Sequence, residues 1–67
     1  MTGQELRAIR REVGWTQARL AEYLELSTNY LARLERGEYP ISERTARDVE
    51  VLYMVYRLAR ALGLLET

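Results

Sequence analysis

The stretch TQARLAEYLELSTNYLARLERG, residues 16–37, decides the fold. Thr16 and Ser27 each precede a segment with apolar side chains at helical spacing, and hydroxyl residues are preferred N-caps. Only Glu25 and Leu26 separate the two segments, so the predicted helices must turn sharply against each other. The side chains expected to face a shared core are Leu20, Ala21, Leu24, Leu31 and Leu34.

A further helix is predicted on the N-terminal side, over about residues 3–13. Thr2 with Glu5 three residues later forms a capping box, and Gly14 supplies a left-handed stop. On the C-terminal side, Ser42 precedes a segment without Gly or Pro up to residue 62. We expect one long helix there, over about residues 43–62, and a break near residues 52–54 into two shorter helices is the alternative.

Residues 16–37 resemble the helix-turn-helix of the Cro/C1/Xre family of phage and bacterial repressors. The resemblance combines Thr-Gln opening the first helix of this pair, Leu-Ala in its middle, an apolar residue and Ser before the second helix of the pair, and a closing Leu-Glu-Arg-Gly. It extends over roughly residues 3–50 and implies one all-α domain, residues 1–67, with a compact four- to five-helix, lambda-repressor-like DNA-binding fold. Glu25 departs from the family pattern. The family commonly has Gly at this position, because the turn needs a left-handed conformation that costs other residues about 1 kcal/mol or more.

The second helix of the pair has a polar face opposite its apolar one. Asn29, Arg33 and Arg36 share that face around the small Ala32. Asn pairs with adenine and Arg with guanine in the major groove, although periodicity alone favours an ordinary solvated face, since exposed Asn and Arg are common. The resemblance implies that Thr28, Asn29 and Arg33 contact bases.

Contacts to DNA phosphates are expected around the same two helices. Gln17 is a good early helix residue in any protein, and the resemblance implies that it holds a phosphate, with Thr16 beside it at the free backbone N–H groups. The other candidates flank the exposed end of the second helix: Arg36, Tyr39 and Arg44. The carboxylates of Glu38 and Glu43, beside them in the sequence, oppose phosphate binding by these residues.

Two charged residues, Arg10 and Glu35, fall at the margin of the predicted core. Helical spacing places Arg10 close to Leu6 and Glu35 close to Leu31 around their helix axes. A lone charge at such a position is costly, whereas an Arg–carboxylate pair is geometrically well matched. We expect these two side chains to form a structural ion pair, which relatives in this family often carry.

The predicted C-terminal helix is apolar over about 240° of its circumference, which exceeds what one small core covers. A second copy of the chain is the expected partner. The alternatives are a broken helix that folds back within one monomer, and an antitoxin-like or adaptor module whose helix binds an unidentified protein. The side chains expected in a homodimer interface are Val51, Met54, Val55, Leu58, Leu62 and Leu65.

The composition excludes several classes. Ten basic residues, all Arg, balance ten acidic ones, and Cys and His are absent, so neither a disulfide nor a zinc site is expected. No segment approaches the roughly 18 apolar residues of a membrane span, and the first residues are not those of a signal peptide. We therefore expect a cytoplasmic, non-enzymatic protein without cofactor or metal. The resemblance, together with the apolar C-terminal helix, implies a dimeric repressor that acts on an inverted-repeat operator in double-stranded DNA.

Overall fold

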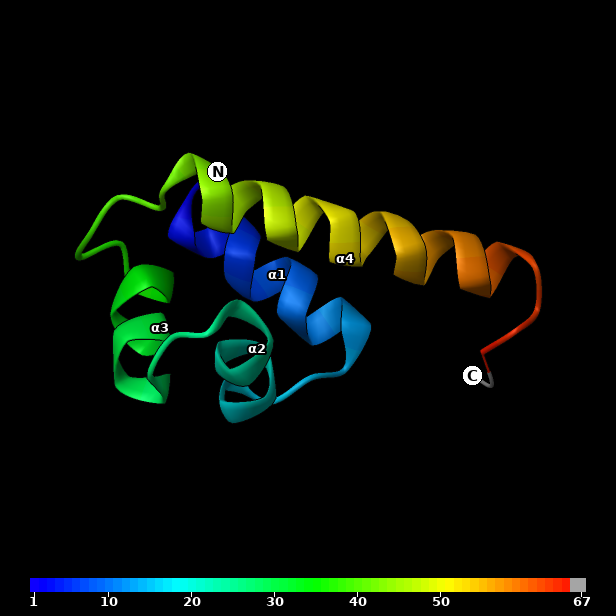
Figure 1. Cartoon of the computed structure of the whole chain (residues 1–67), viewed down its shortest axis with the longest axis horizontal. Helices are drawn as coiled ribbons and strands as arrows, with labels where there is room; N and C mark the ends of the chain where they lie inside the picture. Colours follow the sequence, from blue (N-terminus) through cyan, green and yellow to red (C-terminus); the bar gives the residue numbers. More distant parts are fainter. Residues whose placement is uncertain (66–67) are drawn as a thin grey trace.

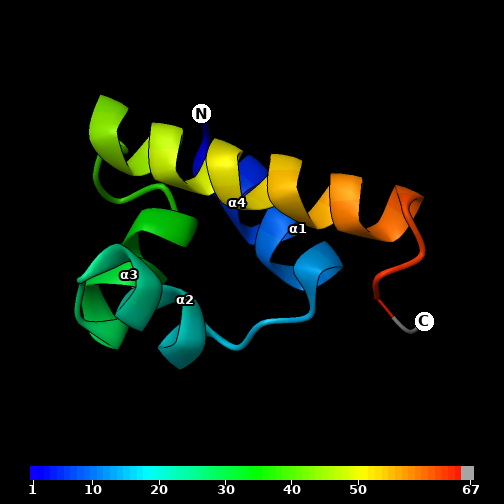
Figure 2. The same ribbon diagram turned by 45° about the vertical axis from the view of Figure 1, so that its right-hand side comes forward.

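Residues 1–65, which the computed structural model describes, form four helices: α1 (Gly3–Val13), α2 (Gln17–Leu24), α3 (Thr28–Glu35) and α4 (Glu43–Ala61). The all-α prediction is confirmed. α4 lies along α1, the short helices α2 and α3 pack against each other, and α3 also packs against α1 and α2 against α4 (Figures 1 and 2). In that part of the chain, no helix is long and apolar enough to span a membrane.

Every helix begins directly after a hydroxyl residue. The side-chain oxygens of Thr2, Thr16, Ser27 and Ser42 each accept a hydrogen bond from the backbone N–H three residues later. At the start of α1 the bond is reciprocal, because the carboxylate of Glu5 also accepts from the backbone N–H of Thr2 at 2.8 Å. These local bonds satisfy N–H groups that have no partner within the helix, and so they fix the four starting points.

The turn between α2 and α3 depends on a left-handed residue. Glu25 adopts φ 59° and ψ 39°, and in residues 1–65 it is the only residue other than Gly with a positive φ. The chain can then reverse, and the backbone N–H of Leu26 donates to the Ala21 carbonyl at 2.8 Å. The strain inferred from the sequence at this position is therefore present, and the turn holds α3 against α2.

The core is small and draws on all four helices. The N-terminal turn of α1 approaches the end of α3 so closely that a Cβ on Gly3 would overlap the carbonyl oxygens of Leu34 and Glu35. Ile9, Trp15 and Leu52 pack against the core from its edge. The buried apolar side chains are Leu6, Leu20, Ala21, Leu24, Leu31, Leu34 and Val49.

Helix α4 is continuous over Glu43–Ala61, so the alternative of a break near residues 52–54 is wrong. Its inner side buries Val49 and half-buries Leu52 and Tyr56. A row of apolar side chains on its other side is exposed: Val51 43%, Met54 62%, Val55 57%, Leu58 59% and, at the helix end, Leu62 64%. We call these five residues the outer row.

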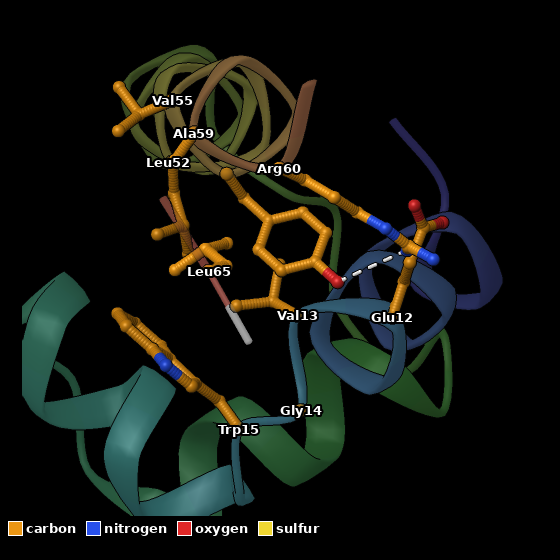
Figure 3. A pocket seen from close by; sticks show the side chains of 10 residues that line it. Glu12, Val13, Gly14, Trp15, Leu52, Val55, Ala59, Arg60 and Leu65 are labelled. Carbon is orange, nitrogen blue, oxygen red and sulfur yellow. Dashed lines mark hydrogen bonds between the residues drawn. The ribbon is translucent and has the colours of Figure 1, made fainter. Parts of the chain in front are cut away.

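Leu65 does not continue the outer row, contrary to the expectation from sequence. The helix ends at Ala61, and Gly63 adopts a positive φ of 74°, which reverses the chain. Leu65 instead lines an open hollow of about 600 Å³ together with Trp15 and Leu52 (Figure 3). The prediction failed because it extended helical spacing past the residue that ends the helix.

Candidate nucleic-acid interface

Helix α3 presents a polar face to solvent. Thr28 and Asn29 in its first turn are exposed, whereas Leu31 and Leu34 on the opposite side are buried. Ala32 is half-buried, so no large side chain separates Asn29 from Arg33 along this face. The three residues predicted to contact bases thus lie on one helix, with Arg33 on the turn that follows the other two.

The chain reverses immediately after α3. Arg36 ends the helix, and Gly37 follows with φ 79°. The backbone N–H of Gly37 donates to the Leu34 carbonyl and that of Glu38 donates to the Arg33 carbonyl, both at 3.0 Å. This pair of bonds is the Schellman motif, for which a left-handed glycine is the favoured residue. As a result, the residues after Gly37 return toward the exposed face of α3.

Tyr39 is the side chain that this reversal brings back to the helix. Its hydroxyl accepts a hydrogen bond from Arg33 Nη1 at 3.4 Å. Its ring stacks on that of Tyr30, with centroids 5.7 Å apart and an interplanar angle of 21°. Arg33 is half-exposed. Tyr39 was predicted from the sequence to contact a phosphate, and its hydrogen bond with Arg33 was not predicted.

The charged candidates around α3 have carboxylate neighbours. Arg36 Nε pairs with Glu38 Oε2 at 2.5 Å, and both side chains are largely exposed. Arg44 lines a shallow hollow beside the turn between α2 and α3, together with Glu25 and Asp48. The positive charge that these arginines offer to a phosphate is therefore locally offset.

Gln17 occupies the first turn of α2, but its side chain is not free. Its amide Nε2 donates to Glu35 Oε1 at 3.0 Å, and the residue is half-buried. Thr16, which caps α2, is exposed. Gln17 and Glu35 are 18 residues apart, so no helical spacing connects them in the sequence, and this contact was missed.

Arg10 and Glu35 meet beneath this region. Arg10 Nε lies 2.7 Å from Glu35 Oε2, with 11% and 3% of the two side chains exposed. Arg10 Nη2 donates to Glu35 Oε1 at 3.1 Å, and Arg10 Nη1 donates to the Trp15 carbonyl at 2.9 Å. The pair ties α1 to the end of α3 and, through Gln17, to the start of α2.

These contacts set the ionisation of Glu35. Burial on its own raises the pKa of this carboxyl, but the hydrogen bonds from Arg10 and Gln17 and the nearby Arg10 charge outweigh it, and the pKa lies below the usual value. Glu35 is therefore an anion with three N–H donors. Among residues 1–65, no three His, Cys, Asp or Glu side chains gather as a metal site would require.

Two known proteins are similar to this chain in sequence. The chain is 47% identical over 47 residues to the immunity repressor protein of Bacillus phage phi105, which covers 70% of this chain and 33% of that protein. It is 46% identical over 41 residues to the HTH-type transcriptional regulator PrpR of Mycobacterium tuberculosis (strain ATCC 25618 / H37Rv), which covers 61% of this chain and 8% of that protein. The chain thus spans a third or less of these relatives. A search of the solved structures gave no match.

A family model described as helix-turn-helix matches residues 6–53, from the buried Leu6 of α1 to Tyr53 in α4. The match includes the whole of α2 and α3, the turn between them, and the Arg10–Glu35 pair. Because this family model covers more than half of the sequence, the chain belongs to the Cro/C1-type helix-turn-helix family.

Proposed function

We propose that this protein is a sequence-specific DNA-binding transcriptional regulator, and that it represses by occupying its operator. The observation that carries the proposal is the polar outer face of α3, held on a helix whose other face is buried against the core. An α-helix fits the major groove of B-DNA, where each base pair shows a distinct pattern of donors and acceptors. The names of the two relatives support the same class.

Base contacts come from Thr28, Asn29 and Arg33 in this proposal. Asn29 pairs with the two major-groove positions of an adenine, and Arg33 pairs with those of a guanine. The half-buried Ala32 allows the helix backbone to approach the base edges closely. Thr28 stands at the N-terminal end of α3, which points into the groove in this mode of binding.

Phosphate contacts come from the start of α2 and the end of α3. The Thr16 hydroxyl can still donate its hydrogen while it caps α2, and Gln17 keeps a second amide hydrogen beyond the one given to Glu35. Arg36 exchanges Glu38 for a phosphate on binding, and Arg44 contributes at the margin. The hydrogen bond from Gln17 to Glu35 sets the orientation of the Gln17 side chain toward the phosphate.

A second copy of the chain covers the outer row of α4. Val51, Met54, Val55 and Leu58 repeat at three- and four-residue steps, which is the spacing that packs one helix against another. Glu50 and Arg57 line one shallow hollow with Met54 and Leu58, so an antiparallel two-fold pairing brings Glu50 of each copy near the other copy's Arg57. Burial of this row also supplies apolar area that a 67-residue domain lacks.

Selection of bound sites from a random DNA pool tests the DNA-binding proposal. We expect an inverted repeat with half-sites about one helical turn apart, or a multiple of that. Asn29→Ala and Arg33→Ala should each lose about 1–3 kcal/mol on the selected site and leave random DNA nearly unaffected. Arg11→Ala on the exposed side of α1 removes the same charge as Arg33→Ala and serves as the control. Equal losses on both DNAs would mean that Asn29 and Arg33 contact phosphates.

Sedimentation tests the dimer. Leu58→Glu should convert a dimer into a monomer and weaken operator binding, because the new charge is buried only when two copies meet. Leu64→Glu is the matched control, since Leu64 is 72% exposed and lies beyond the end of α4. A wild-type chain that stays monomeric at micromolar concentration, or a Leu58→Glu variant with unchanged mass, would refute the interface.

The competing class is an antitoxin-like or adaptor module whose α4 binds a different protein. The exposed outer row and the net charge of zero favour it. The two classes differ in binding to random DNA at low salt, because a DNA-binding protein must retain salt-sensitive, non-specific affinity. A gel shift with random duplex at low and moderate salt therefore separates them.

A further inference from the structure

Arg33 is the longest side chain among the proposed base contacts and has the most rotamers to choose from. An arginine that is free in solution loses this freedom when it binds a guanine, and the loss reduces the affinity gained. A neighbour that already holds the guanidinium removes part of that cost. In the structure the neighbour is Tyr39, whose hydroxyl accepts from Arg33 Nη1.

We propose that Tyr39 is a positioning residue that sets the base specificity of Arg33, and is not principally a phosphate contact. This inference rests on the proposed function, since it concerns how the recognition helix reads DNA. Arg33 has five N–H donors in a planar fork, and a guanine requires two of them. One hydrogen on Nη1 can therefore remain bonded to Tyr39 while the fork contacts the base.

Three features hold Tyr39 in place for this role. The hydrogen bonds that follow Gly37 direct the chain back along α3, as described above. The ring of Tyr39 is stacked on that of Tyr30, which lies three residues before Arg33 and so on the same side of the helix. Pro40 follows directly, and a proline restricts the backbone of the residue before it to extended conformations.

The Tyr39→Phe variant separates the hydroxyl from the ring. It keeps the stack on Tyr30 and the turn, and it removes only the acceptor for Arg33. Tyr23→Phe is the matched control, because the Tyr23 hydroxyl donates to the Asp48 carbonyl at 3.3 Å, in a contact between α2 and α4. Both variants lose one exposed phenolic hydrogen bond, and only one of these bonds involves Arg33.

The experiment measures binding to the selected operator, to all its single-base-pair variants, and to random duplex. Arg33→Ala first identifies the base pair that Arg33 reads, as the position where discrimination is lost. Tyr39→Phe should reduce discrimination at that same position by about two- to tenfold, the equivalent of one hydrogen bond. Other positions and random DNA should be unchanged, and Tyr23→Phe should match the wild type.

A second measurement excludes a merely structural effect. In the Arg33→Ala background, Tyr39→Phe should have no further effect on discrimination, because the side chain that it positions is gone. Equal loss on operator and random DNA would show that Tyr39 contacts a phosphate and would overturn the inference, as would wild-type discrimination by Tyr39→Phe. The absence of any DNA binding by the wild-type protein at low salt is a different outcome, because it would refute the proposed function itself.

Discussion

Removal of either member of the Arg10–Glu35 pair should cost far more than removal of both. Glu35 accepts from two nitrogens of Arg10 and from Gln17, and its side chain is 3% exposed. In Arg10→Met the carboxylate keeps only the Gln17 donor, and in Glu35→Leu the guanidinium keeps only the Trp15 carbonyl. Each single change therefore leaves an uncompensated charge at the edge of the core.

The expected magnitudes follow from this burial. Breaking a buried pair costs about 3–5 kcal/mol, and the partial exposure of Arg10 favours the lower end, about 3 kcal/mol for each variant. The whole domain is expected to be stable by only about 3–10 kcal/mol. The double variant, with Met and Leu in contact, should lose about 1–2 kcal/mol, mainly from the unpaired Trp15 carbonyl. Additive behaviour would instead give about 6 kcal/mol.

Urea unfolding measures these differences. Trp15, the only tryptophan, packs against the core and reports its disruption by fluorescence, and helical circular dichroism provides the second signal. All variants should be compared at one protein concentration, because dimerisation adds stability. The exposed Arg19–Glu22 pair, 3.7 Å apart, is the control, and its coupling should stay below about 0.5 kcal/mol. Additive losses for Arg10 and Glu35 would refute the reasoning.

Two further predictions concern Glu35 and Gly3. The folded-state pKa of Glu35 lies below its usual value of 4.5, so its ionised form stabilises the fold above about pH 4.5, and that stability is lost as the pH falls through the folded-state pKa. The difference in unfolding free energy between wild type and Glu35→Gln should therefore shrink from pH 5 to pH 3, and a constant difference would contradict the lowered pKa. Gly3→Ala should destabilise the fold by about 1–3 kcal/mol in thermal melts, because the new Cβ overlaps the carbonyl oxygens at the end of α3. Gln4→Ala in the same turn is the control and should change stability by less than about 0.5 kcal/mol. Equal effects of the two variants would mean that α1 and α3 lie further apart than in the structure.

Some features of the recognition surface could be predicted from the sequence, and the reason is their local origin. Asn29 shares one side of a short helix with Arg33, and three- and four-residue spacing is enough to place them together. The contact of Tyr39 with Arg33 was missed, although Gly37 after the helix signals a reversal of the chain. The sequence marks such a turn but not which side chain lies over which afterwards, because that depends on the path of the whole loop.

The same distinction separates what the sequence by itself determined from what the tertiary structure decided. Helix starts were predictable because a cap bonds to a backbone group three residues away, and the sharp turn between α2 and α3 followed from the short gap between them. The left-handed conformation of Glu25 was implied by the family resemblance. The bond from Gln17 to Glu35 and the close approach of Gly3 to the end of α3 were not predictable. Both join segments distant in the chain, so they depend on how the helices cross and pack, and only the folded core fixes those positions.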